Sequence, residues 1–255
     1  MLVKVIEMLN SFILLLKHDL NLVKNRIYVY FLFFFFPVLL ILFFSIPLSF
    51  VFTNYKPIYL IWSTTGVCVV STLIFSFIVT MEVFLKRQKN EFIFSVPIRI
   101  NSYILSFYFF SLLISFFEFS FSIFLINSLN NYFLSFLDCL IIFFLLIPAI
   151  LFITSFIFFF GPYLRENIDI VVYVFFFFIF LAFGLGAFFP LNIYPEFYMN
   201  SIQFFPIGCS IINIQRVISA ENIYFSFLII SFLYSVIFIF ISYIIYNSKI
   251  KERLY

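Results

Sequence analysis

Long runs of apolar residues alternate with short polar segments along most of this chain. The runs approach or exceed the roughly 20 residues that a helix needs to cross the hydrocarbon core of a bilayer. Only helices and closed barrels satisfy their own backbone inside a bilayer, and strict two-residue alternation is absent, so we expect helices. The pattern predicts six spans, at residues 27–52, 58–85, 103–126, 133–160, 170–189 and 223–246.

The N-terminal segment follows a different pattern. Apolar residues recur three or four positions apart, and polar residues fill the other side. This spacing predicts an amphipathic helix over residues 2–27 that lies in the membrane interface and serves as an anchoring and sensing element. A core helix of a soluble domain would show the same spacing, but the sequence that follows contains no soluble domain.

Two further segments interrupt the series of spans. Residues 86–101, between the second and third spans, form a short amphipathic stretch with four basic residues. Residues 190–216 are only moderately apolar and contain Pro190, Pro195 and Pro206. Because Pro breaks helices, we expect a re-entrant pair of short helices on the outer side there. Such backbone is tolerated at membrane depth where protein or a water-filled cavity covers it.

Basic residues are distributed unevenly around these spans. Of the 14 Lys and Arg residues, all except Lys56 and Arg216 fall in four clusters on one side of the predicted spans. Basic residues accumulate on the cytoplasmic side of membrane proteins, so we expect both termini in the cytoplasm. The formal net charge of +3 then follows from the topology and indicates no nucleic-acid partner.

The composition agrees with a lipid environment. Hydrophobic residues make up 65% of the chain and charged residues only 10%, which is too little polar surface for a water-soluble protein. We therefore expect a multi-pass protein of the cell membrane. We interpret the 48 Phe and 16 Tyr as coding bias in an AT-rich genome, and we expect a bacterial origin.

Motifs for chemistry are few in this sequence. No glycine begins the Gly-x4-Gly-Lys pattern that cradles nucleotide phosphates, so we expect no ATP hydrolysis on this chain. The single histidine, His18, cannot form a metal site or a catalytic triad by itself, and we expect it at the surface. The three cysteines are isolated and read as inert buried thiols. We expect neither enzyme activity nor a cofactor on this chain.

Three carboxylates fall inside or beside the predicted spans, where ionisable groups are costly. Glu82 comes one turn before Lys86, which predicts an ion pair along one helix. Asp138 is near the outer end of the fourth span and can reach the lipid headgroups. For Glu118, in the outer half of the third span, two interpretations stay open. It is a buried carboxylate hydrogen-bonded to neighbouring Ser and Tyr, or a cation-attracting group on a candidate cargo route.

The segment after the second span resembles a signature of the ABC type-2 exporter permeases. In that family an acidic residue within a basic stretch precedes an apolar run, a Ser or Thr, a Pro and a basic or polar residue. This chain has the same order at Glu91, Phe92, Ile93, Phe94, Ser95, Pro97, Arg99 and Tyr103. It lacks the Gly that family members often carry between the acidic residue and the apolar run.

The outer segment resembles the same family, in which the fifth span ends in Gly and an aromatic-Pro pair before a Pro-punctuated hairpin. The matching residues here are Gly186, Phe189, Pro190, Pro195, Pro206 and Arg216. With six spans and an interfacial entry helix, the likeness extends over essentially the whole chain. It implies an all-α polytopic membrane fold with a single transmembrane permease domain over residues 1–255.

The resemblance also implies how such a protein works. Two permease copies, identical or sister chains, pair around a central route, and each presents the loop over residues 86–101 as a coupling helix to a separate ABC ATPase subunit. That partner binds ATP and Mg. The implied coupling residues are Lys86, Arg87, Lys89, Glu91, Phe92, Ile93, Phe94, Pro97 and Arg99. The implied outer gate comprises Phe189, Pro190, Pro195, Pro206 and Arg216.

The family resemblance is compatible with more than one class of cargo. We expect export of a peptide, a drug or another amphipathic molecule, with lipid or glycan export as an alternative. A secondary carrier or channel that uses intramembrane carboxylates, and a non-transporting scaffold or sensor, are the other classes that the sequence leaves open.

Overall fold

The computed structural model of this chain describes residues 2–51, 56–89, 100–129, 134–160, 176–177, 180, 184–189 and 195–254. Within these ranges the regular secondary structure is helical, and no strand occurs among the described residues. The elements are α1 (Leu2–Lys24), α2 (Ile27–Phe34), α3 (Phe36–Leu40), the π-helix η1 (Ile41–Ser45), α4 (Ile46–Val51), α5 (Lys56–Lys89), α7 (Ile100–Leu129), α8 (Phe136–Phe160), α10 (Glu196–Ile202), α11 (Pro206–Ile218) and α12 (Phe225–Leu254). An all-helical fold is confirmed for the described part of the chain.

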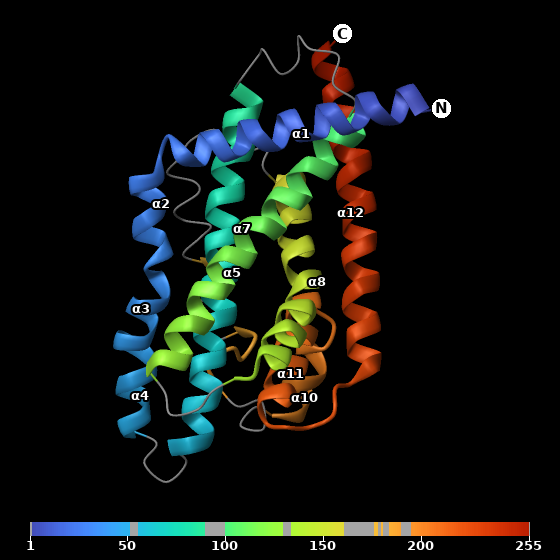
Figure 1. Cartoon of the computed structure of the whole chain (residues 1–255). Coiled ribbons are helices and arrows are strands. Elements are labelled where there is room, and N and C mark those ends of the chain that lie inside the picture. Colours follow the sequence, from blue (N-terminus) through green and yellow to red (C-terminus); the bar gives the residue numbers. More distant parts are fainter. Residues whose placement is uncertain are drawn as a thin grey trace.

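Four of these helices are long and apolar enough to cross a membrane. Their apolar stretches lie in α5, α7, α8 and α12, at Ser63–Gln88, Asn101–Ser128, Phe136–Phe160 and Phe225–Ile245. They correspond to the second, third, fourth and last predicted spans, and they run along the length of the bundle in Figure 1. The chain is a multi-pass membrane protein by this measure.

The first predicted span, which the sequence interrupts with Pro37 and Pro47, is not a single helix. It consists of α2, α3, η1 and α4, which follow one another along the side of the bundle (Figure 1). Helix α3 begins at Phe36, and its second residue, Pro37, has no backbone N–H to continue the hydrogen bonds of α2, which explains the break there. The fifth predicted span, residues 170–189, lies mostly outside the described residues.

Helix α1 lies across one end of the bundle, roughly perpendicular to the long helices (Figure 1). This is the orientation expected of an interfacial helix, and α1 covers most of the predicted range 2–27. The C-terminal end of α12 lies at the same end (Figure 1). We call this end of the molecule the α1 end. The two short helices α10 and α11 lie at the opposite end, where a broken pair was expected.

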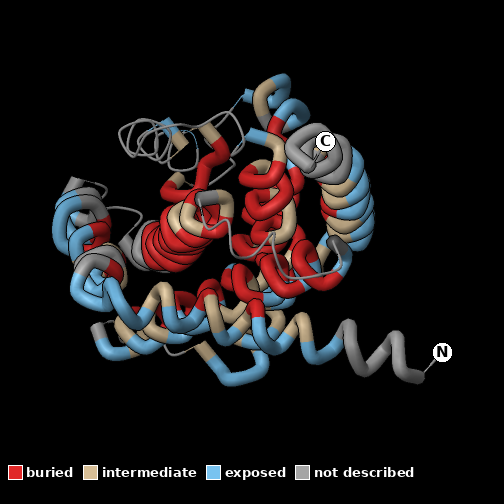
Figure 2. The backbone as a smooth tube through the Cα atoms, turned by 90° about the horizontal axis from the view of Figure 1, so that it is seen from above, coloured by how far each residue is buried: buried red, intermediate tan, exposed pale blue. Residues whose placement is uncertain are grey.

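Helix α5 is the central helix of the bundle. In the most apolar stretch of α5, 94% of the residues are buried inside the protein, whereas only 17% are buried in the corresponding stretch of α12. Figure 2 shows the same contrast, with buried residues on the central helices and exposed residues along the outer side of α12. Since α12 presents apolar side chains outward, lipid is the solvent that suits it.

Small hydroxyl side chains join the central helices to one another. Ser71 of α5 contacts Ser122 of α7 at 2.9 Å, and Ser76 of α5 contacts Ser111 of α7 at 3.1 Å. Thr154 of α8 donates to Ser111 at 2.7 Å. Small polar residues let helix backbones approach closely in membranes and hydrogen-bond across the interface. This polar seam fixes α7 and α8 against α5.

Candidate functional site at the α1 end of the bundle

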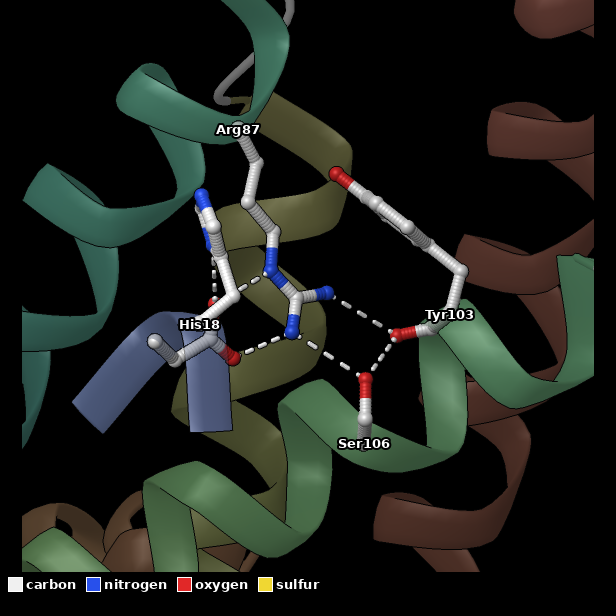
Figure 3. A network of polar contacts seen from close by, with 5 residues as sticks. His18, Arg87, Tyr103 and Ser106 are labelled. Carbon is white, nitrogen blue, oxygen red and sulfur yellow. Dashed lines mark hydrogen bonds and ion pairs between the residues drawn. The ribbon is translucent and has the colours of Figure 1, made fainter. Parts of the chain in front are cut away.

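A buried ion pair joins α1 to α5 at the α1 end. Arg87 is two residues before the last residue of α5, Lys89, and Asp19 is in α1. Both side chains are fully buried, with no exposed surface. The Nε atom of Arg87 donates to Oδ1 of Asp19 at 2.7 Å, and its Nη2 atom donates to Oδ2 (Figure 3). The pair is therefore bidentate, the strongest geometry for these two groups.

Helix α7 completes the surroundings of the Arg87 guanidinium. Nη1 of Arg87 donates to the backbone oxygen of Tyr103 at 3.1 Å, and Nη2 donates to Oγ of Ser106 at 3.1 Å (Figure 3). The guanidinium carbon lies 4.7 Å from the ring centre of Tyr103 and 5.3 Å from that of Phe107. Such cation–π contacts favour a desolvated cation. Arg87 thus connects α5 to both α1 and α7.

The energetics of this pair depend on its completeness. Removing two charges from water costs several kcal/mol per ion, and good geometry with further hydrogen bonds offsets that cost. Removing one partner alone leaves an uncompensated buried charge, which typically destabilises a protein by about 3–5 kcal/mol. The pair holds α1 in one position against α5 and α7.

A second, more exposed ionic group lies nearby on α5. Glu82 accepts from Nζ of Lys86 at 2.8 Å, so the ion pair predicted from their spacing is confirmed. Glu82 also pairs with Arg26, in the turn between α1 and α2, at 2.9 Å. The hydroxyl of Tyr30 in α2 donates to the other carboxylate oxygen at 2.7 Å. Glu82 therefore ties the α1–α2 junction to α5.

The structure describes only part of the predicted coupling set. The side chain of Lys86 forms an ion pair with Glu82, and the side chain of Arg87 is buried within the chain instead of facing outward. Lys89 ends α5, and its side chain is outside the described part. Glu91, Phe92, Ile93, Phe94, Pro97 and Arg99 lie outside the described residues.

The described members of the predicted outer gate lie at the end opposite α1, and they are Phe189, Pro195, Pro206 and Arg216. Pro190 falls outside the described residues. Pro195 is exposed, and Pro206 is buried at the start of α11. Arg216 donates from Nε to the backbone oxygen of Asn222 at 2.6 Å. Its guanidinium lies 3.7 Å from the ring centre of Tyr224.

Residues 184–189 pack against both α5 and α11. Nε2 of Gln215 in α11 donates to the backbone oxygens of Gly186, at 2.9 Å, and Phe189, at 3.2 Å. A Cβ atom on Gly66 of α5 would lie only 2.2 Å from the backbone oxygen of Ala187. Glycine is therefore required at this close approach. These contacts bring the predicted gate residue Phe189 next to α11.

Glu118 is the most isolated ionisable group in the described part of the chain. It is fully buried on α7, and neither of its carboxylate oxygens has a hydrogen-bond partner there. Burial agrees with the first interpretation of this residue, whereas the expected hydrogen bonds to Ser and Tyr are not formed. A carboxylate without partners is strongly disfavoured in an apolar interior, so this environment favours the neutral acid.

Sequence reasoning did not identify Asp19, the partner of Arg87. The two residues are 68 positions apart, and a lone Asp on the polar side of an amphipathic helix looks like a solvated charge. Only the packing of α1 across the bundle reveals the pair. His18 is next to Asp19 in sequence, and its side chain is only 31% exposed, with Nδ1 lying 3.6 Å from the Asp19 carboxylate. It is more enclosed than the sequence suggested.

Other reactive groups offer little chemistry. No cluster of three or more His, Cys, Asp or Glu residues that could hold a metal ion occurs among the residues that the structure describes. Cys68, Cys139 and Cys209 are free thiols, and Cys68 and Cys209 are buried. Burial raises the pKa of Cys209 to about 11, so this thiol stays protonated at neutral pH.

Comparisons with known proteins give no family assignment. No protein-family model matches this chain, and no curated protein matches it.

Proposed function

We propose that this chain is the membrane-spanning subunit of an ATP-driven exporter of the ABC type-2 class. In this proposal a separate ATPase subunit binds ATP and Mg and docks on the loop between α5 and α7 at the α1 end. That end faces the cytoplasm of a bacterial cell. The chain itself catalyses no reaction.

The Arg87 cluster is the observation that carries this proposal. Arg87 is the last buried anchor on α5 before residues 90–99, which contain most of the coupling residues implied by the family resemblance. Through Asp19 and Ser106 it is fastened to α1 and α7. A force applied to the loop by a partner would therefore reach three helices at once. A two-state movement driven by ATP needs such a rigid connection.

The opposite end supports an outer gate in the same proposal. Helices α10 and α11 are short and are separated by a break before Pro206, and α11 packs against α5, α8 and α12. We propose that they re-enter the membrane from the outer side and close the export route, with Phe189, Pro190, Pro195, Pro206 and Arg216 at the gate. Two copies of the chain, or this chain and a sister permease, would enclose the route.

The test is co-expression of this chain with an ATPase encoded by a neighbouring gene, followed by purification. We expect a stable complex for the natural chain. The double substitution Glu91→Arg with Phe92→Ala should abolish assembly because it reverses the charge and removes the aromatic anchor of the proposed docking surface.

The chain offers a matched control for this experiment. Glu196 and Phe197 form the same dipeptide at the end opposite α1, and both side chains are exposed. Glu196→Arg with Phe197→Ala should leave assembly with the ATPase unchanged. Assembly that survives the Glu91 and Phe92 substitutions, or that is lost equally in the control, contradicts the proposed docking surface.

Glu118 favours one alternative function, a secondary carrier or channel. A fully buried carboxyl without a partner in a membrane helix is a candidate ion site. This alternative predicts cargo movement in vesicles that contain the purified chain without any ATPase, and loss of that movement in Glu118→Gln. The exporter proposal predicts no movement without the ATPase.

A further inference from the structure

A cavity of about 310 Å³ lies between α5, α8, the start of α11 and four residues that precede α10, namely Phe176, Phe177, Phe180 and Leu185. Of its ten lining residues, seven are Phe, and the others are Ile153, Leu185 and Ile207. This volume falls at the lower end of the roughly 300–1,000 Å³ that is typical of small-molecule sites. No polar side chain lines it among the described residues.

The cavity has a closed floor and an open mouth. Ile153, Leu185 and Ile207 are 1%, 1% and 2% exposed and form the floor. At the mouth, Phe176 is 65% exposed and Phe205 is 45% exposed. Because α5 and α8 have the composition of membrane spans, this mouth opens at a depth where hydrocarbon is the solvent.

Aromatic contacts connect the walls. The rings of Phe77 in α5 and Phe177 lie 5.3 Å apart between their centres. The rings of Phe180 and Phe205 lie 5.8 Å apart and are nearly perpendicular. Edge-to-face and tilted pairs of this kind stabilise aromatic clusters. The walls are therefore held by contacts of their own while the space between them stays open.

We infer that this cavity binds the alkyl chain of an amphipathic cargo. A charged or hydroxylated group would lose its hydrogen bonds to water and find no partner on these walls. An alkyl chain loses no hydrogen bonds on entry, and the polar head of the same molecule can stay at the membrane–water interface while the chain reaches the cavity through its mouth. The inference rests on the proposed exporter function and narrows its cargo, since it disfavours a glycan without a lipid tail.

The position of the cavity connects it to the proposed outer gate. Phe205 and Ile207 flank Pro206, the gate residue at the start of α11, and both line the cavity. A shift of α11 would therefore change the mouth and the floor together. Cargo binding and gate position are coupled in this arrangement.

The experiment uses the purified chain in nanodiscs and a homologous series of alkyl phosphocholines that carry a diazirine at the chain terminus. After photolysis, mass spectrometry maps the labelled peptides. We expect saturable labelling of the peptide around Phe152 and Phe156, displaced by excess unlabelled alkyl phosphocholine. Because the mouth opens into hydrocarbon, we measure labelling at a fixed mole fraction of the alkyl phosphocholine in the nanodisc. Labelling should rise with each added methylene, which gains contacts with the cavity walls, and should level off once the cavity is full.

Two substitutions of the floor residue Ile153 make the test specific. Ile153→Trp fills the cavity and should abolish saturable labelling. Ile153→Ala enlarges the cavity, so labelling should level off at a longer alkyl chain than in the natural protein. Ile237→Trp, on the exposed side of α12, is the matched control and should change neither result.

Several results would overturn the inference. The first is labelling near Phe152 that no competitor displaces, which is the result expected for bulk lipid. The second is labelling that appears only when a second copy of the chain is kept away from the mouth of the cavity. The third is a dependence on alkyl-chain length that stays unchanged in Ile153→Ala. None of these measurements requires the ATPase. A failure here alongside normal ATPase assembly therefore rejects the alkyl site but leaves the exporter proposal intact.

Discussion

Arg87 of α5 and Glu118 of α7 are both fully buried ionisable groups on neighbouring helices, but their hydrogen-bonding environments are opposite. Arg87, near the α1 end of α5, has a bidentate carboxylate partner, two further acceptors and two aromatic rings. Glu118, further along α7, has no hydrogen-bond partner for either oxygen within the described residues. A buried charged side chain whose hydrogen bonds are all formed can hold helices together. A buried ionisable side chain without partners must stay neutral or bind a ligand.

The contrast suggests a division of work along the bundle. Near the α1 end, charge fixes α1, α5 and α7 as one unit. Further along the bundle, the described contacts among α5, α7 and α8 are hydroxyl pairs and apolar packing, and the buried carboxyl of Glu118 forms no hydrogen bond within the described residues. We therefore expect the α1 end to transmit force and the rest of the bundle to adjust to cargo.

The largest effect should come from breaking the buried pair. Asp19→Leu leaves the Arg87 guanidinium buried without its counter-ion and should lower the stability of the protein by about 3–5 kcal/mol. Thermal unfolding of the purified protein in detergent measures this loss. The double variant Asp19→Leu with Arg87→Met removes both charges and should recover most of it. Equal destabilisation in the single and double variants would show that the charge pair is not the source.

An intermediate effect is expected at the second ionic group. Glu82→Gln weakens contacts with Arg26, Lys86 and Tyr30, but its side chain is 17% exposed and water screens its charge. We expect a loss of about 1 kcal/mol. Added salt should shrink this difference and leave the effect of Asp19→Leu unchanged. A salt-independent loss for Glu82→Gln would place this group with the buried pair instead.

The smallest effect should be seen at Glu118. Glu118→Gln keeps the shape of a neutral carboxylic acid and removes no hydrogen bond, so the free energy of unfolding should change by less than about 0.5 kcal/mol. Cargo selectivity of the complex with its ATPase should change more than the amount of folded protein. A loss of folded protein equal to the change in selectivity would assign this residue a purely structural role.

The parts of the fold that sequence could predict are those that depend on local pattern. The apolar runs of α5, α7, α8 and α12 are long enough to be recognised from the local sequence alone. The spacing of Glu82 and Lys86 likewise predicts their ion pair without knowledge of the fold. Prolines mark an interruption in both Pro-containing segments, at Pro37 and Pro47 in the first predicted span and at Pro190, Pro195 and Pro206 in the outer segment. The first predicted span, with Pro37, is divided into short helices by local backbone geometry.

The parts that sequence could not predict depend on distant packing. Asp19 and Arg87 are 68 residues apart, and neither position carries a local signal that names the other. The same holds for the Phe-lined cavity, because Phe residues occur in every predicted span and only the fold selects the seven that face one space. The hydrogen bonds that one of the two interpretations gave to Glu118 are not formed within the described residues, and the local sequence does not show which hydroxyl groups the packing brings near this side chain.

The proposed function depends on an ATPase that docks on the loop between α5 and α7 at the α1 end. Site-specific photo-cross-linking can detect this docking, with a photoreactive phenylalanine analogue in place of Phe92 or Phe197 in cells that express the candidate ATPase. We predict a cross-link to the ATPase from position 92 and none from position 197. A cross-link from position 197, or none from position 92 in any nucleotide state, would contradict the proposed docking.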